Sequence, residues 1–272
     1  MINLNGELFN KSTEVFNANN RAFKYGDALF ETIKVKDLIV HFSEDHYFRL
    51  MASMRMLRME IPMNFTLEFL VNELIKTVKL NNLKNARVRL TVFRKEGGFY
   101  NPLTNKVDYL IEAQPLNSVV KENYRIDLFK DYYIYSGILS TVKTTNKITN
   151  VLASIYASEN DFDNCILVNE KKQVVEAING NIFIVKGNLI KTPAITNGCV
   201  KGIARKKVIE IVSKIEEYTL EETVISPFDL QKADEIFITN SIVGIQHVSV
   251  YKKCVFNNKV SKEIAIEFDK LI

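Results

Sequence analysis

Residues 174–205 read VVEAINGNIFIVKGNLIKTPAITNGCVKGIAR. Two β-rich runs lead into a loop that ends at Gly202, and a helical pattern begins at Ile203. A helix start offers unpaired backbone N–H groups and the positive end of the helix dipole, which together suit a phosphate. Glu176 stands inside the first apolar run, where a buried carboxylate needs a cationic or hydrogen-bonding partner. Each feature has a plainer alternative: a simple turn at Gly202, and a solvent-facing position on an edge strand for Glu176.

Lys143 lies upstream, in the small and uncharged segment STVKTTN (residues 140–146), just before a predicted helix. Burial of a lysine in such a segment would lower the pKa of its amine and make the amine available for a Schiff base. The alternative, an ordinary exposed lysine, applies to any one of the 27 lysines.

The chain divides into two blocks of mixed strands and helices. In the first block we expect strands over 31–42 (with a turn at Lys36-Asp37), 86–94 and 108–114, and helices from His46, capped by Ser43 or Asp45, and over 65–80. In the second block we expect strands over 124–130, 165–169, 174–177, 181–185, 235–239 and 248–256, and helices over 147–160 and 203–215. This order predicts an α/β or α+β fold, with a smaller N-terminal domain (1–116), a linker (117–123) and a larger C-terminal domain (124–272).

Composition excludes several classes of protein. The 272 residues are 47% hydrophobic and 25% charged, which is typical of a globular protein with a sizeable core. The net charge of +4 is spread along the chain, so we expect no nucleic-acid partner. The three cysteines form no C-x-x-C pair and the three histidines show no ligand spacing, which predicts no metal site and fits a reducing cytoplasm. No apolar stretch reaches membrane-spanning length, and the first residues do not resemble a signal peptide.

The ordered set of motifs resembles the class IV aminotransferase family, which are pyridoxal-phosphate (PLP) enzymes of fold type IV. The resemblance covers nearly the whole chain. It rests on Arg21–Thr32 (R-x-x-x-[YF]-G-D-x-x-F-E-T), His46–Leu50 (H-x-x-R-L), Lys143–Asn146 (K-x-x-N), Glu176–Phe183 (E-x-x-x-x-N-[IV]-F), Thr192-Pro193 (T-P) and Gly202–Arg205 (G-I-T-R). It implies the two-domain architecture of the D-amino-acid aminotransferases, with PLP between the domains, and a homodimer.

The resemblance also implies roles for the catalytic residues. Lys143 would hold PLP through a Schiff base and then act as the general base at the substrate carbon. Glu176 would keep the pyridine nitrogen protonated, so that the ring can act as an electron sink. Thr32 falls where the family's lyases have a threonine that assists pyruvate elimination.

A separate group would bind the cofactor phosphate. The resemblance assigns this role to Arg49 and to the backbone N–H groups of Ile203 and Ala204, helped by Asn240 and Ser241. Ala204 departs from the family's usual threonine, so the backbone N–H is kept but a hydroxyl is lost. The phosphate site would therefore depend more on Ser241.

The family contains branched-chain aminotransferases, D-amino-acid aminotransferases and 4-amino-4-deoxychorismate lyases. The lyases release pyruvate and leave 4-aminobenzoate, a precursor in folate biosynthesis. Lys147 follows Asn146 where branched-chain enzymes typically have tyrosine, and Thr239-Asn240-Ser241 resembles the lyase block. The loop from Arg94 to Tyr100 looks like the lyase R-x-x-G-G-x-x-Y loop, without its internal arginine.

We therefore favour a lyase acting on a small amino substrate over a transaminase of the branched-chain or D-amino-acid type. A non-catalytic PLP-binding protein is a third hypothesis, which the retained Lys143, Glu176 and Arg49 make remote. Arg94 is our candidate for a substrate carboxylate, because a guanidinium can bind it through two hydrogen bonds. The alternative for Arg94 is a surface arginine at the end of a strand.

Overall fold

Internal contacts divide the computed structural model, which describes residues 1–272, into two units. The N-terminal unit comprises Met1–Asn117 together with Lys143–Asn146, and the C-terminal unit comprises Ser118–Val142 and Lys147–Ile272. Both units mix helices with strands, so the fold class is α/β, as predicted. None of the helices combines the length and the apolar character that crossing a membrane requires.

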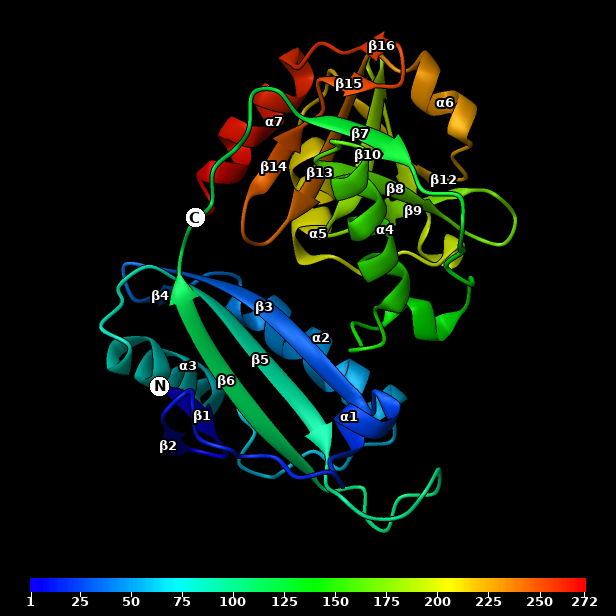
Figure 1. Cartoon of the computed structure of the whole chain (residues 1–272). Helices are drawn as coiled ribbons and strands as arrows, with labels where there is room; N and C mark the ends of the chain where they lie inside the picture. The colour runs from blue at the N-terminus through cyan, green and yellow to red at the C-terminus, as the bar shows by residue number, and fades with distance from the viewer. The chain divides into compact units, whose positions relative to one another are not determined.

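The N-terminal unit is built on one six-stranded sheet with the order β2-β1-β6-β5-β3-β4, in which every pairing is antiparallel. Its strands are β1 (Ile2–Leu4), β2 (Glu7–Phe9), β3 (Ala28–Lys36), β4 (Ile39–Val40), β5 (Ala86–Arg94) and β6 (Val107–Pro115), and its helices are α1 (Arg21–Tyr25), α2 (Ser43–Met56) and α3 (Leu67–Leu80). Figure 1 shows the three long strands side by side, with α2 and α3 against one face.

Side chains of β3 alternate between the two faces of this sheet, as a strand requires. Leu29, Glu31 and Ile33 are buried, and the last two line the space beneath α2 and α3. Phe30 and Thr32 are half-buried and belong to the opposite face. The face without helices therefore carries the side chains that remain accessible.

The segment Lys143–Asn146 packs with the N-terminal unit, although we placed Lys143 in the C-terminal domain. That assignment is wrong because the segment forms an antiparallel bridge with β3, in which Leu29 pairs with Thr144. The change of unit between Asn117 and Ser118 lies in the region that we took as the linker.

The C-terminal unit contains two five-stranded sheets, with the orders β12-β11-β10-β13-β14 and β16-β15-β7-β8-β9. Its strands are β7 (Arg125–Leu128), β8 (Asn164–Val168), β9 (Val174–Ala177), β10 (Asn181–Lys186), β11 (Leu189–Pro193), β12 (Thr219–Thr223), β13 (Glu235–Asn240), β14 (Gly244–His247), β15 (Val250–Tyr251) and β16 (Cys254–Val255). Its helices are α4 (Ile148–Glu159), α5 (Ile203–Val212), α6 (Pro227–Lys232) and α7 (Lys259–Asp269), with short 3-10 turns η1 (Ile138–Thr141) and η2 (Ile195–Asn197).

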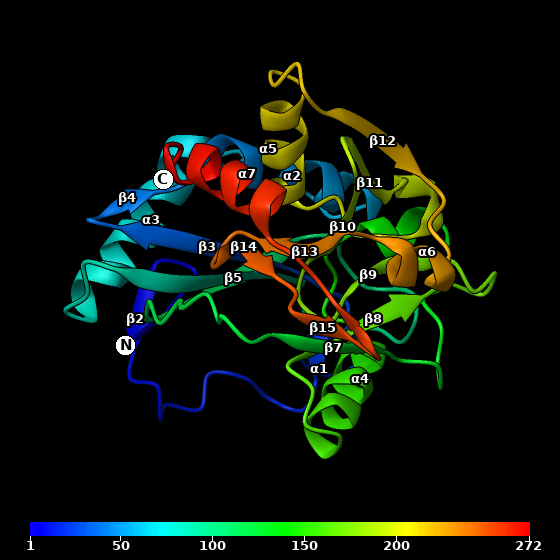
Figure 2. The same ribbon diagram turned by 90° about the horizontal axis from the view of Figure 1, so that it is seen from above.

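The core of this unit joins the two sheets. Ile126 and Ile166 from one sheet belong to the same buried cluster as Ile182 and Ile236 from the other. Helix α4 packs on β8, whereas α5 and α7 pack on β13 and β14. Figure 2 shows α4 on one side of the strands and α5 with α7 on the other.

Two local predictions were wrong. Helix α2 begins at Ser43 after Phe42, which adopts a φ of 55°, and no side chain caps it, so neither Ser43 nor Asp45 has the expected capping role. The strand expected over 248–256 is broken into β15 and β16, because Lys252 turns with a φ of 54°. These two errors concern the ends of predicted elements. The structure also contains elements that were not predicted, namely α1, α6, α7, β1, β2, β11, β12 and β14.

Candidate active site

Lys143 reaches the accessible face of the N-terminal sheet. Its Nζ lies 4.4 Å from the centroid of the Phe30 ring, and the guanidinium carbon of Arg89 lies 3.9 Å from the same centroid. The lysine amine and the guanidinium of Arg89 therefore lie against the same aromatic ring. Thr32 stands directly opposite Arg89 in the pairing of β3 with β5. One face thus presents an amine, a hydroxyl and a guanidinium.

We did not single out Arg89 from the sequence. It is half-buried, and burial lowers its pKa, an effect that Glu112 opposes and the neighbouring charge of Arg87 reinforces. Its Nε donates a hydrogen bond to Thr91 Oγ1 at 3.3 Å. A half-buried guanidinium beside a second cation is a position that a substrate anion would stabilise. The signal in the sequence was the alternation of β5, which puts Arg87, Arg89 and Thr91 on one face.

Arg94, our candidate for the substrate carboxylate, is buried inside the N-terminal unit. Its Nε donates to Asp27 Oδ2 at 2.9 Å, and its Nη1 donates to Asn105 Oδ1 at 2.6 Å. Further hydrogen bonds run to the carbonyl oxygens of Leu57 and Arg58. Because these bonds occupy most of the five donors of the guanidinium, the structure favours a structural role for Arg94 over substrate binding.

Arg49 belongs to a buried ionic cluster with Glu31 and His46. Its Nε donates to Glu31 Oε1 at 2.8 Å, and its Nη2 donates to the second carboxylate oxygen. His46 Nδ1 lies 2.7 Å from Glu31 Oε2. Burial alone would raise the pKa of Glu31, but Arg49 and His46 hold it at about 2. Burial also lowers the pKa of His46, against the opposing effect of Glu31. Glu31 is therefore an anion at neutral pH, and it fixes the orientation of Arg49.

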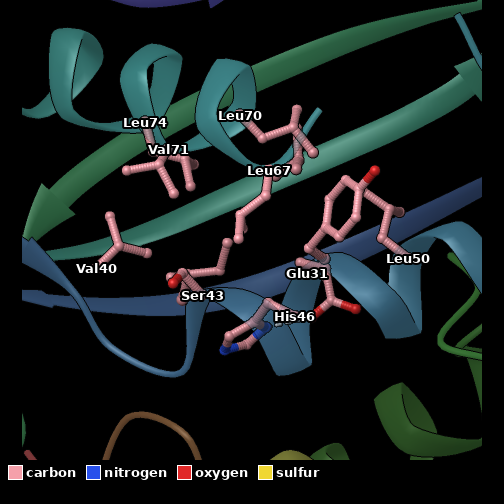
Figure 3. Close-up of a pocket in the computed structure, with 12 residues that line it drawn as sticks. Glu31, Val40, Ser43, His46, Leu50, Leu67, Leu70, Val71 and Leu74 are labelled. Carbon is pink, nitrogen blue, oxygen red and sulfur yellow. Dashed lines mark hydrogen bonds and ion pairs between the residues drawn. The ribbon is translucent and has the colours of Figure 1, made fainter. Parts of the chain in front are cut away.

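A small cavity lies on the other side of β3, beneath α2 and α3. Figure 3 shows Glu31 and His46 directed toward each other at its edge, and leucine and valine side chains form most of the remaining wall. Its water-accessible volume of about 20 Å³ has room for about one water molecule. Phe30 and Thr32 belong to the opposite face of β3, so their side chains do not line this cavity.

In the C-terminal unit, Glu176 and Asn181 hold the same residue. Glu176 Oε2 accepts a hydrogen bond from Val200 N–H at 2.9 Å, and Asn181 Nδ2 donates to the Val200 carbonyl at 2.9 Å. Strand β9 is the edge of its sheet, but Glu176 is only 6% exposed. The solvent-facing alternative for Glu176 is therefore wrong, because the loop that contains Val200 packs against the carboxylate.

The start of α5 follows this loop directly. Gly202 precedes the first turn, no side chain caps it, and Ile203 and Ala204 are almost fully buried. A Cβ atom at Gly202 would lie 1.9 Å from Asn181 Oδ1, so a larger residue would displace the Asn181 side chain. Buried N–H groups at an uncapped helix start need a partner, and a phosphate is well suited to that role.

A further polar group adjoins this helix start. Thr239 pairs with Asn181 across β10 and β13, so their side chains share one face of the sheet. Its hydroxyl is buried and has no hydrogen-bond partner within the chain. Asn240, by contrast, uses its side-chain oxygen to accept the N–H groups of Ile242 and Val243 and shapes the turn that also contains Ser241. Thr239 was missed because its buried position depends on pairing with a distant strand.

Comparison with known proteins identifies the family. The model of amino-transferase class IV matches residues 28–251, which is most of the chain. This chain belongs to the class IV aminotransferase family. Membership makes it a PLP-dependent enzyme of the transaminase and lyase group.

Relatives within the class IV aminotransferases bear different names. A Methanocaldococcus jannaschii protein named as a branched-chain-amino-acid aminotransferase is 32% identical over 97% of this chain and 92% of its own length. An aminodeoxychorismate lyase of Vibrio harveyi is 25% identical, with 85% of each chain covered. The crystal structure of a Thermoproteus uzoniensis branched-chain aminotransferase matches with a TM-score of 0.90 at 23% identity, covering 99% of this chain and 93% of that one.

The residues of this class IV aminotransferase fit PLP. The uncapped start of α5 and the unpartnered Thr239 hydroxyl are donors of the kind that a phosphate requires. Glu176 is a buried carboxylate, the kind of group that a protonated ring nitrogen requires.

Proposed function

We propose that this class IV aminotransferase is a 4-amino-4-deoxychorismate lyase, which eliminates pyruvate and leaves 4-aminobenzoate. The observation that carries the proposal is the cross-strand pair of Thr32 and Arg89 beside Phe30, whose ring Lys143 contacts. A substrate that carries carboxylates and a leaving oxygen requires a cation and a proton relay next to the base. The lyase-like blocks at Asn146-Lys147 and Thr239-Asn240-Ser241 support the same choice.

Bound PLP would supply an electron sink for the negative charge that develops at the substrate carbon. Lys143 would bind the cofactor and, once displaced by substrate, take the proton from that carbon. Glu176 would keep the ring nitrogen protonated. Arg49 and the N–H groups of Ile203 and Ala204 would bind the phosphate, with Thr239 and Ser241 as further hydroxyl donors.

The remaining roles belong to Arg89 and Thr32. The guanidinium of Arg89 would pair with a substrate carboxylate and orient the amino group toward Lys143. The hydroxyl of Thr32 would pass a proton to the oxygen that leaves as pyruvate. Together they separate elimination from transamination, since transamination needs no proton at a leaving oxygen.

A transaminase of the branched-chain type is the second candidate. It is favoured by the Methanocaldococcus jannaschii relative, which covers nearly the whole chain at 32% identity. In that case Arg89 would bind the carboxylate of the amino acid, and Thr32 would have no chemical role.

The enzyme is also proposed to act as a homodimer. The outer face of α4 exposes Ile148, Val151 and Ile155, and the helix has no charged residue before Glu159. An apolar helix face of this kind is typical of a surface that a partner covers. Light scattering after size-exclusion chromatography would test this, and a monomer at micromolar concentration would contradict it.

One assay separates the candidates. Purified protein loaded with PLP is incubated with 4-amino-4-deoxychorismate while pyruvate is measured, and in parallel with leucine and 2-oxoglutarate while glutamate is measured. We expect pyruvate without glutamate. Glutamate without pyruvate would replace the lyase by the transaminase, and neither product from PLP-loaded protein would favour the non-catalytic hypothesis.

Replacement of Arg89 by methionine should weaken substrate binding. The variant keeps the bulk over Phe30 but loses the cation, so we expect KM for 4-amino-4-deoxychorismate to rise about 10- to 100-fold, as loss of a charged hydrogen bond would predict. Arg125 is the matched control, since it is a strand arginine 5.7 Å from the Phe162 ring in the other unit. An unchanged KM in Arg89→Met would exclude the proposed carboxylate site.

A further inference from the structure

The segment that carries Lys143 is fastened to β3 by its backbone. Phe30 N–H donates to the Lys143 carbonyl at 3.0 Å, and Thr145 N–H donates to the Ala28 carbonyl at 3.0 Å. The chain on both sides of the segment belongs to the C-terminal unit. The four residues Lys143–Asn146 therefore belong to the N-terminal unit. Two backbone hydrogen bonds alone would attach them to β3 only weakly.

Two side chains add to this attachment, and both reach the same carbonyl. Thr145 Oγ1 donates to Gly26 O at 3.2 Å, and Asn146 Nδ2 donates to Gly26 O at 3.1 Å. Gly26 follows helix α1 with a φ of 62°. A Cβ atom there would lie 2.2 Å from Asn146 Oδ1, so the glycine is required both by its conformation and by the close approach of Asn146.

We propose that Thr145, Asn146 and Gly26 form a clip that positions Lys143 by setting the register of its segment against β3. Side chains alternate along a strand, so a slip of one residue would turn the Lys143 side chain away from Phe30. The clip prevents that slip because it holds the residues just after the lysine. These are positioning residues, and the inference rests on the proposed cofactor attachment at Lys143.

Two measurements test the clip without any substrate. The first is hydrogen exchange at the Phe30 and Thr145 amides, and the second is the rate at which added PLP becomes attached to Lys143, trapped with borohydride and located by mass spectrometry. In the Thr145→Val, Asn146→Ala double variant we expect exchange to rise about 5-fold for each lost hydrogen bond, roughly 25-fold in all. We expect attachment at Lys143 to slow by a similar factor.

Matched variants separate positioning from general damage. Asn150→Ala removes another side-chain amide bond to a backbone carbonyl, that of Ile178, and should change neither measurement. Thr145→Ser keeps the hydroxyl and should restore most of the protection in combination with intact Asn146. Gly26→Ala displaces the Asn146 side chain and should act like Asn146→Ala or more strongly.

Unchanged exchange in the double variant would overturn the clip. Faster exchange with an unchanged rate of attachment would overturn its positioning role. Neither result depends on which substrate the enzyme uses, so a failed lyase assay leaves this test intact. Attachment of PLP at a lysine other than Lys143 in the wild-type protein would instead remove the premise.

Discussion

The Lys143→Ala variant should fold normally but lose both covalent attachment of PLP and nearly all turnover. Its backbone keeps the bonds to Phe30 and Ala28, because they involve main-chain atoms and the Thr145 amide. What disappears is the amine that lies 4.4 Å from the Phe30 ring centroid. Loss of a general base alone costs roughly 10²–10⁴-fold in rate, and loss of the attachment adds to that.

Borohydride reduction followed by peptide mapping measures the attachment directly. Lys130→Ala, at an exposed lysine of the other unit, is the control and should keep both the adduct and the activity. A trapped adduct that persists in Lys143→Ala would mean that another lysine holds the cofactor. The sheet face with Phe30, Thr32 and Arg89 would then no longer be a candidate active site.

Replacement of Glu176 by glutamine should keep PLP bound but reduce turnover about 10- to 100-fold, the kinetic equivalent of a charged hydrogen bond. The amide oxygen of glutamine can still accept the Val200 N–H bond, so the loop before α5 should keep its shape. The substitution removes only the negative charge, which in the proposed role would keep a ring nitrogen protonated.

Steady-state rates at saturating PLP measure this effect, and the visible spectrum reports retention of the cofactor. Glu170→Gln changes an exposed carboxylate that accepts hydrogen bonds from Ser136, and it serves as the control. A rate close to wild type in Glu176→Gln would contradict the role at the ring nitrogen, whatever reaction the enzyme performs.

The sequence predicted the bounds of a strand or helix correctly where an uninterrupted hydrophobic pattern spans the whole element. Strand β5 runs over 86–94 as predicted, because its alternation is uninterrupted. Helix α7 was missed, and its first turn is held by the distant carboxylate of Glu235, which accepts the N–H groups of Val260 and Ser261. A cap that comes from another strand leaves no signal near the helix it stabilises.

In the candidate site, too, local motifs predicted some residues, whereas others depend on contacts between distant segments. The motif order predicted Lys143, Glu176 and the start of α5, whose roles as cofactor ligands stay predictions. Arg94 was our candidate for the substrate carboxylate because a guanidinium can bind it through two hydrogen bonds, but Asp27 and Asn105 bind Arg94 in the fold. The register of β3 against β5 decides which arginine faces Lys143, and register depends on pairing between distant segments.

Val200 gives this enzyme a mutational constraint. Glu176 accepts a hydrogen bond from the Val200 N–H, and Asn181 donates one to the Val200 carbonyl. Substitutions at positions 176 and 181 should therefore have effects that depend on each other. A double-mutant cycle on the two should show non-additive losses of stability. Replacement of Glu176 by a cation would remove the acceptor of the Val200 N–H and disturb the loop that leads into α5. Redesign for new chemistry should therefore vary the sheet face that carries Arg89 and Thr32, and leave Glu176 and Asn181 unchanged.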